Sequence, residues 1–103
     1  MIVRAWRGWT TSSNQHAYVS HFQRNVIPQL RGVDGFVGVT LLKEFQSERV
    51  EFLVLSWWAS MDAIRSFAGK DITRAVVEPE AVAVLVDFER TVHHYEIIEE
   101  VVA

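Results

Sequence analysis

The chain of 103 residues contains no cysteine. This absence excludes disulfide bridges, thiol nucleophiles and cysteine-ligated zinc, and it fits a reducing, cytoplasmic location. Lysine and arginine together number only 10, they form no basic run, and the formal net charge is −3. Because binding to a phosphate backbone needs clustered cations, we expect no nucleic-acid partner.

Long apolar segments are missing as well. No run approaches the ~20 apolar residues of a membrane span, and the first residues lack the apolar segment of a secretory signal peptide. The sequence therefore predicts no membrane association. Its length matches one domain, which we place over residues 1–103.

Apolar side chains are abundant for so short a chain. They make up 50% of the residues, and Trp, Tyr and Phe contribute 4, 2 and 6 of them. A small domain has much surface relative to its volume, so part of this apolar excess is expected to face a partner. A second copy of the chain is the simplest such partner.

Residues 52–69 form the clearest local unit, a buried strand followed directly by a capped helix. Apolar residues fill 52–55, and two tryptophans follow. Ser60 is placed as the N-cap of the helix, and Asp62 lies in the first turn, where the helix dipole favours negative charge. Gly69 can end the helix in a left-handed conformation.

The first half of the chain predicts a strand, a helix and a hairpin. A strand covers 2–9, and a helix begins near Ser12 or Ser13. Pro28 is expected to kink or end this helix, with at most one irregular turn to Arg31. Further elements are a turn at 32–35, a strand over 36–44, a polar connection at 46–48, and a strand over 49–58.

The second half is less uniform. After the helix at 60–68, Asp71 can cap a short helical piece that carries Ile72, Ala75 and Val76. Two alternatives remain for the next segment: a helical turn that begins at Pro79 and runs to about Leu85, or an extended segment over 81–88. A strand rich in β-branched and aromatic residues covers 92–101.

The predicted order β-α-β-β-α-(α)-β indicates an α+β fold, a ferredoxin-like antiparallel sheet with its helices on one face. The other face of such a sheet is normally polar. Here residues 52, 54 and 58 on one face and 53, 55 and 57 on the other are all apolar. We therefore predict a homodimer through the open sheet face.

Three segments carry a family resemblance: Ile2–Gly8, Phe52–Gly69 with its Trp-x-Ser-x-x-Ala-Ile-x-x-Phe pattern, and Thr91–Ile97. Together they resemble the antibiotic biosynthesis monooxygenase-like family of the dimeric α+β barrel superfamily. The resemblance implies sheets that pair into a barrel. It also implies either cofactor-free oxidation of anthrones and quinols or degradation of haem.

The haem-degrading branch differs from this chain at its functional positions. The resemblance places Trp6, Phe67 and about Val77 where that branch has asparagine, tryptophan and a haem-ligating histidine. No histidine lies between His21 and His93. We therefore expect no haem degradation by that route and no cofactor.

The histidines do not form a metal site. His93 and His94 are neighbours on a strand and point to opposite faces, so they cannot bind one ion together. His16 and His21 lie about 140° apart around a helix. One of His93 and His94 faces the helix-side cavity and can act as a base there, or is simply hydrogen-bonded in the core. Glu96 shares the face of His94 and can orient it.

Arg4 and Trp6 share the cavity-side face of the first strand. Arg4 can hold a phenolate or carboxylate, or can instead form a salt bridge to Glu96 or Glu51. Trp6 can stack on an aromatic ligand or can fill the core. The remaining expected pocket residues are Tyr18, His21, Phe22, Phe67 and Glu96.

These residues lead to two hypotheses. In the first, the protein is a cofactor-independent monooxygenase of a small aromatic, quinol- or anthrone-like substrate, with His94, Trp6 and Arg4 as the catalytic residues. In the second, it is a non-catalytic dimer that binds a small aromatic molecule or a tetrapyrrole. A cavity with convergent polar groups favours the first, whereas a cavity filled by the protein's own tryptophans favours the second.

Overall fold

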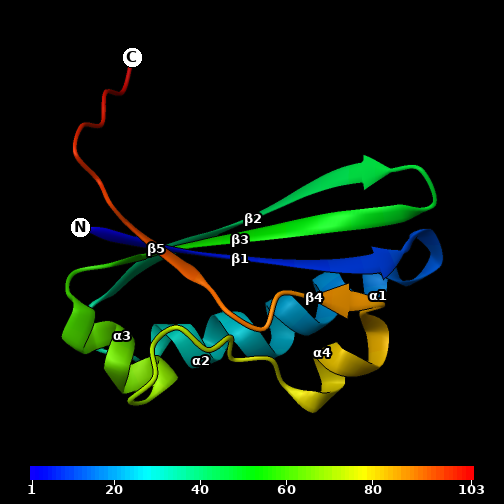
Figure 1. Ribbon diagram of the computed structural model, residues 1–103, viewed down its shortest axis with the longest axis horizontal. Coiled ribbons are helices and arrows are strands. Elements are labelled where there is room, and N and C mark those ends of the chain that lie inside the picture. The colour runs from blue at the N-terminus through cyan, green and yellow to red at the C-terminus, as the bar shows by residue number, and fades with distance from the viewer.

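The computed structural model describes all residues, 1–103, as one sheet with helices packed on one of its faces (Figure 1). The strands are β1 Ile2–Thr11, β2 Phe36–Gln46, β3 Arg49–Trp58, β4 Asp87–Phe88 and β5 His93–Glu96. The helical segments are η1 Ser12–Asn14, α1 Gln15–His21, η2 Phe22–Val26, α2 Ile27–Arg31, α3 Met61–Ala68 and α4 Pro79–Val84. None of the helices combines the length and the apolar character that a membrane crossing needs.

The sheet is antiparallel, with the strand order β2-β3-β1-β4. Both β4 and β5 pair with the outer edge of β1, β4 opposite Gly8 and Trp9 and β5 opposite residues 2–5. This order is the ferredoxin-like arrangement expected from the sequence. The predicted fold class is confirmed.

The first crossover is one continuous helical stretch with an irregular middle. Thr11 caps its start, accepting a hydrogen bond from the Asn14 amide at 3.2 Å. A π-helical turn, η2, separates α1 from α2, and Pro28 lies in the first turn of α2. The wider turn accommodates a proline that lacks an N–H donor. The helix ends at Arg31 as predicted, although its irregular turn precedes Pro28 rather than following it.

The strand-to-helix unit forms as the sequence predicts. The Ser60 hydroxyl accepts a hydrogen bond from the Ala63 amide at 3.1 Å, which caps α3. Gly69 has a φ of +88° and its amide donates to the Arg65 carbonyl at 2.8 Å, ending the helix. Local signals therefore determine this unit completely.

The region after Gly69 differs from the prediction. The helical piece capped by Asp71 is absent, although the Asp71 carboxylate accepts hydrogen bonds from the amide and hydroxyl of Thr73 as a cap would. The backbone instead pairs with a distant segment: the Ala75 amide donates to the Arg90 carbonyl at 2.9 Å, and the Val92 amide donates to the Thr73 carbonyl at 2.8 Å. Arg74 forms an isolated bridge with Thr91. Of the two alternatives at 79–88, the helix occupies 79–84 and only 87–88 are extended.

The last strand is shorter than predicted. β5 ends at Glu96, and residues 97–103 have no regular structure. A strand needs a neighbour for its backbone groups, and within one chain β1 begins at Ile2 and offers none beyond that point.

The core lies between the helices and the sheet in two clusters. One contains Tyr18, Val50, Phe52 and Ala81, and the other contains Leu30, Trp58, Ala63 and Ile64. Trp58 is fully buried, and its indole N–H donates to the Ser56 hydroxyl at 2.8 Å. Both clusters border the space described below.

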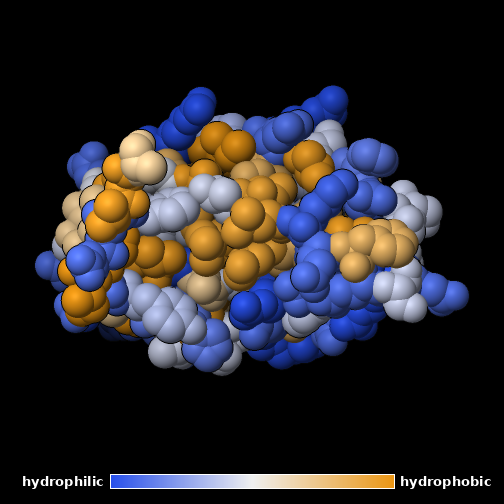
Figure 2. All heavy atoms as spheres, turned by 90° about the horizontal axis from the view of Figure 1, so that it is seen from above, coloured by the Kyte–Doolittle hydropathy of each residue, from blue (hydrophilic) through white to orange (hydrophobic).

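The opposite face of the sheet carries no helix. Viewed onto this face, Figure 2 shows a broad hydrophobic area across its centre. Strand register places Val3 beside Trp57, Ala5 beside Leu55, and Leu42 beside Leu53 on this side. The expected two-sided apolar sheet is therefore present.

Candidate functional site

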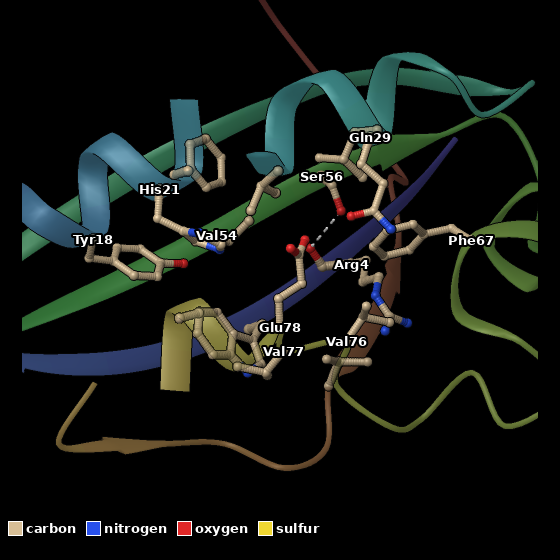
Figure 3. Close-up of a pocket in the computed structure, with 16 residues that line it drawn as sticks. Arg4, Tyr18, His21, Gln29, Val54, Ser56, Phe67, Val76, Val77 and Glu78 are labelled. Atoms are coloured by element: carbon tan, nitrogen blue, oxygen red, sulfur yellow. Dashed lines mark hydrogen bonds between the residues drawn. The ribbon is translucent and has the colours of Figure 1, made fainter. Parts of the chain in front are cut away.

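A cavity of about 70 Å³ lies between the helices and the sheet (Figure 3). Its walls come from β1, β3, the α1–α2 stretch, α3, the segment before α4, and α4 itself. Of its 16 lining residues, 11 are hydrophobic. In a mostly apolar cavity, the few polar groups are the ones that can orient a ligand.

Six of the eight site residues expected from the sequence line this cavity. They are Arg4, Trp6, Tyr18, His21, Phe22 and Phe67. His94 and Glu96 do not line it. The strand and helix periodicities thus bring most of the expected residues to one place, while β5 lies behind Arg4 rather than on the cavity wall.

Arg4 is buried, with 5% of its surface exposed. Its Nη1 donates to the Ile72 carbonyl at 2.6 Å and approaches His94 Nε2 at 2.9 Å, while Nη2 donates to the Arg74 carbonyl at 2.9 Å. Burial lowers the pKa of Arg4 to about 10, so it remains a cation at neutral pH. A guanidinium has five N–H donors, and these three contacts leave the Nε hydrogen and one Nη2 hydrogen unused.

His94 lies on the helix side of the sheet, opposite Arg4, and its neighbour His93 lies on the open side. Because a guanidinium can only donate, the Nε2 atom of His94 accepts the hydrogen bond. Desolvation first, then the charges of Arg4 and His93, lowers the pKa of His94. His94 is therefore a neutral acceptor that holds Arg4, and its Nε2 is not free to take a proton from a ligand.

Glu96 is exposed and lies outside the cavity, which corrects the expectation that it is a pocket residue. It sits opposite Ile2, near the end of the sheet and past Arg4. The alternative salt bridges of Arg4 with Glu96 or Glu51 are not formed either. Arg7 instead lies 3.8 Å from Glu51 and 3.9 Å from Glu89.

Trp6 forms an apolar wall of the cavity. Its indole N–H donates to the Glu89 carbonyl at 2.7 Å, so this donor is not available to a ligand. The ring lies over Gly8, where an added Cβ would come within 2.5 Å of it. Trp6 can thus contribute ring contact but no hydrogen bond.

His21 presents the most unusual polar atom. The residue is 7% exposed, and Asn25 Nδ2 lies 3.0 Å from its Nδ1. An amide NH₂ group only donates, so Nδ1 accepts and the neutral ring carries its hydrogen on Nε2. This Nε2 is buried without any partner, and the ring points into the cavity (Figure 3). A buried donor without a partner is costly, and a ligand oxygen would satisfy it.

Tyr18 and Glu78 add two further polar groups. Burial raises the pKa of Tyr18, so its hydroxyl stays protonated and can donate. Glu78 does not cap α4 with its side chain, and its carboxylate has no ion-pair partner. Figure 3 shows the Tyr18 hydroxyl, the His21 ring and the Glu78 carboxylate pointing toward the same space.

Sequence reasoning missed Glu78, together with Gln29 and Ser56, which also line the cavity. One signal was available for Glu78: it is the only charged residue within the apolar run Val76-Val77-Glu78-Pro79, directly before a helix start. No metal centre is indicated, because no three His, Asp or Glu side chains gather closely enough to hold an ion.

A comparison with family models matches residues 1–79 to the antibiotic biosynthesis monooxygenase model. A search of curated proteins finds no match. Among solved structures, SnoaB, a cofactor-independent oxygenase from Streptomyces nogalater, is 18% identical with a TM-score of 0.67, over 96% of this chain and 95% of SnoaB.

Two further solved structures share the fold. A monooxygenase of Streptomyces coelicolor from the gene ActVA-Orf6, in complex with nanaomycin D, is 15% identical with a TM-score of 0.65, over 99% of this chain and 91% of that one. The haem degrader MhuD of Mycobacterium tuberculosis, with two haems in its active site, is 17% identical with a TM-score of 0.63, over 98% of this chain and 99% of MhuD.

Proposed function

Because the chain belongs to the antibiotic biosynthesis monooxygenase family, we propose that it is a cofactor-independent monooxygenase of a small aromatic, quinol- or anthrone-like substrate. The substrate binds in the helix–sheet cavity. Two relatives in fold support the reaction class by their own descriptions: SnoaB is a cofactor-independent oxygenase, and the Streptomyces coelicolor monooxygenase holds nanaomycin D.

One observation carries the proposal: a buried His21 Nε2 without a partner faces an apolar cavity that also contains a carboxylate. Glu78, His21 and Arg4 have complementary roles. Glu78 accepts the acidic proton of the substrate, and His21 Nε2–H donates to the oxygen on which negative charge then develops. Arg4 contributes a fixed positive charge at the cavity wall. His94 holds Arg4 in place, and Trp6 and Phe67 provide apolar contact for the rings.

The reaction needs no group beyond the substrate and oxygen. Removal of a proton from an anthrone methylene gives an enolate, which is electron-rich enough to reduce O₂ and form a carbon–oxygen bond. The resulting peroxide loses water, so that CH₂ and O₂ become C=O and H₂O. One oxygen atom enters the product and the other leaves as water, and the substrate supplies all four electrons. The apolar walls keep bulk water from the intermediate.

The enclosed volume of about 70 Å³ is well below the ~300 Å³ of small ligand sites. A ringed substrate can therefore enter only if a wall moves. Residues 69–78 contain no helix or strand apart from the Arg74–Thr91 bridge, and they supply Val76, Val77 and Glu78 to the cavity. We assign the opening to this segment.

The test is oxygen consumption with a panel of anthrones and naphthoquinols, with ¹⁸O₂ to follow incorporation of one labelled atom. Glu78→Gln and His21→Phe should each lower kcat by about a hundredfold, the usual effect of losing a general base or an oxyanion donor. Glu80→Gln, exposed in the first turn of α4 two residues after Glu78, is the matched control and should keep full activity. Absence of turnover across the panel, or full activity in both cavity variants, would refute the proposal.

The second candidate function is a non-catalytic protein that binds a small aromatic molecule or a tetrapyrrole. The position of Trp6 favours it, because this side chain lines the cavity with its indole N–H already donated to the Glu89 carbonyl and offers a ligand ring contact only. Entry of such a ligand needs the same movement of the 69–78 segment. MhuD shows that a protein of this fold can hold haem. A haem titration decides: a Soret shift without oxygen consumption supports this candidate.

We also propose a homodimer through the open sheet face. The apolar side chains of β1, β3 and β2 on that face are otherwise exposed to water, and patches of this kind mark interaction sites. A second copy places an equal apolar face against it, as twofold symmetry requires. Native mass spectrometry at micromolar concentration tests it, and a monomeric mass throughout would refute it.

A further inference from the structure

Arg4 is a buried cation without a counter-ion. It is 5% exposed, and its three hydrogen-bond partners are the Ile72 and Arg74 carbonyls and the neutral His94 ring. No aspartate or glutamate of the chain forms an ion pair with it. Because burial of a charge is costly unless an opposite charge lies beside it, Arg4 is suited to an anion that comes from outside the chain.

The cavity is polar at both ends. Figure 3 shows Tyr18 and His21 at one end and the Glu78 carboxylate near the middle. Arg4 and Gln29 lie toward the other end. Glu78 is the one carboxylate on the wall, and it forms no ion pair with Arg4. A ligand that spans the cavity therefore meets hydrogen-bonding groups at one end and an unpaired cation at the other.

The Arg4 end of the cavity is also its mouth. Gln29 on α2 and Val76 in the segment before α4 line the cavity and are nonetheless exposed, and Figure 3 shows both on the side of Arg4. His21, at the other end, is buried. A charged group is less costly to bind near the mouth, where it keeps part of its hydration, whereas apolar rings are favoured deeper inside.

We infer that the substrate carries a carboxylate, which Arg4 binds at the mouth while the aromatic rings extend toward Glu78 and His21. The inference rests on the proposed monooxygenase function and narrows its substrate class. The free N–H groups of Arg4 are on Nε and Nη2, two nitrogens bonded to the same carbon. A carboxylate has two oxygens that can accept from such a pair. The exposed Gln29 amide can donate a further hydrogen bond.

Other anionic groups fit this end of the cavity less well. A phosphate carries about two negative charges and three acceptor oxygens, but Arg4 is the single cation on the wall. An ordinary phenol has a pKa of about 10 and is neutral at pH 7, whereas a carboxylic acid is ionised there. One ionised carboxylate balances the charge of Arg4 completely.

Arg4 also links the carboxylate to the part of the wall that opens. Its Nη1 and Nη2 donate to the Ile72 and Arg74 carbonyls, both in the 69–78 segment. A substrate carboxylate on the same guanidinium is held against this segment once it has closed. Binding energy from a group remote from the reaction then positions the reacting carbon at Glu78 and His21.

Calorimetric binding of two unreactive ligands tests the inference without turnover. The ligands are anthraquinone-2-carboxylate and its carboxamide, which have the same rings and nearly the same shape and differ by one charge. The carboxylate should bind the unmodified chain about tenfold more tightly, or better, because it gains charged hydrogen bonds. Arg4→Gln removes the cation and should abolish this difference, with circular dichroism to show that the variant is folded.

Gln29→Glu keeps the test independent of the stability of the Arg4 variant, because Gln29 is exposed on α2. A negative charge at the mouth should weaken binding of the carboxylate by about fivefold and leave the carboxamide nearly unaffected. Gln23→Glu makes the same change on the same helical stretch but outside the cavity. This matched control should bind both ligands as the unmodified chain does.

The outcomes separate the carboxylate site from the proposed reaction. Equal affinity of the two ligands for the unmodified chain, or equal effects of Gln29→Glu and Gln23→Glu on the carboxylate, would overturn the carboxylate site. The proposed reaction would then stand or fall on oxygen consumption with neutral substrates. A preference for the carboxylate without oxygen consumption would support the site and refute the monooxygenase. Failure of both ligands to bind at millimolar concentration would also overturn the carboxylate site.

Discussion

The pairing of Arg4 with His94 is the residue-scale feature that the sequence reached in part. Strand alternation put His94 or His93 on the cavity side, and register decides for His94. Periodicity could not predict that Arg4 and His94 are hydrogen-bonded. Because Arg4 donates to the Nε2 atom of His94, His94 positions Arg4 and does not act as the expected base. The distance between these two side chains is set by the packing of the sheet and is not encoded in the sequence spacing.

His21 and Glu78 also could not be placed together from the sequence. They are far apart in the sequence, one on a helix and one in a connecting segment. His21 was expected from the sequence to be a pocket residue. Only the packing of the 69–78 segment over the sheet shows that Glu78 shares its space.

Protonation of His94 should make stability depend on pH. Its pKa is below the ordinary 6.5, so its contribution is complete above pH 6.5 and is lost as pH falls from 6.5 through the lowered value. The unfolded chain binds a proton in that window and the folded chain does not. Urea denaturation at pH 5 and pH 8 should show a smaller difference in His94→Gln than in the unmodified chain.

His16→Gln is the control for this measurement, because His16 is exposed on α1 and is not among the groups that lower the pKa of His94. Its difference between pH 5 and pH 8 should equal that of the unmodified chain. An unchanged difference in His94→Gln would show that the lowered pKa of His94 does not contribute to the pH dependence of stability.

Replacing Arg4 should be costly for stability. Arg4→Met leaves the Ile72 and Arg74 carbonyls without their donor and removes the cation beside His94. We expect a loss of about 3 kcal/mol in the free energy of unfolding, from two partly buried acceptors at roughly 1–3 kcal/mol each. Arg65→Met, which removes an exposed pair with Asp62, should cost less than about 1 kcal/mol. Equal losses in the two variants would contradict the structural role of Arg4.

At the scale of elements, local chemistry determined what could be predicted. Ser60 and Gly69 set both ends of α3 because caps act within a few residues. The predicted helix after Asp71 does not form because the backbone around Arg74 pairs with the segment around Thr91 instead. Thr91 is distant in sequence, and its pairing is set by the whole sheet.

Within β1, the Trp6 ring lies directly against Gly8, and this contact gives a prediction at the scale of the element. A Cβ on Gly8 would lie 2.5 Å from the ring, so Gly8→Ala should displace the indole and cost about 1–3 kcal/mol of stability. Gly38→Ala is the matched control on β2, because its nearest side-chain atom would be 4.0 Å away. Urea unfolding and near-ultraviolet circular dichroism measure the two effects. Equal stability of the two variants would mean that the ring does not depend on Gly8.

For the whole molecule, composition gave the most far-reaching expectation. An apolar share of 50% in 103 residues exceeds what one helix-covered face can bury, and the open face holds the remainder. Leu55 lies on this face, opposite Ala5. A charge placed there remains hydrated in a monomer but would be desolvated without a partner in a dimer.

Leu55→Lys should therefore shift the protein to monomers while leaving the fold intact. We expect the dissociation constant in sedimentation equilibrium to rise about a hundredfold, as for a residue at the centre of an interface. Val82→Lys adds the same charge to an exposed valine on α4, on the helix side. This variant should keep the dimer dissociation constant of the unmodified chain. The helix–sheet cavity lies on the far side of the sheet from Leu55, so the monomer should keep its turnover. If both variants sediment like the unmodified chain, the open face is not the interface.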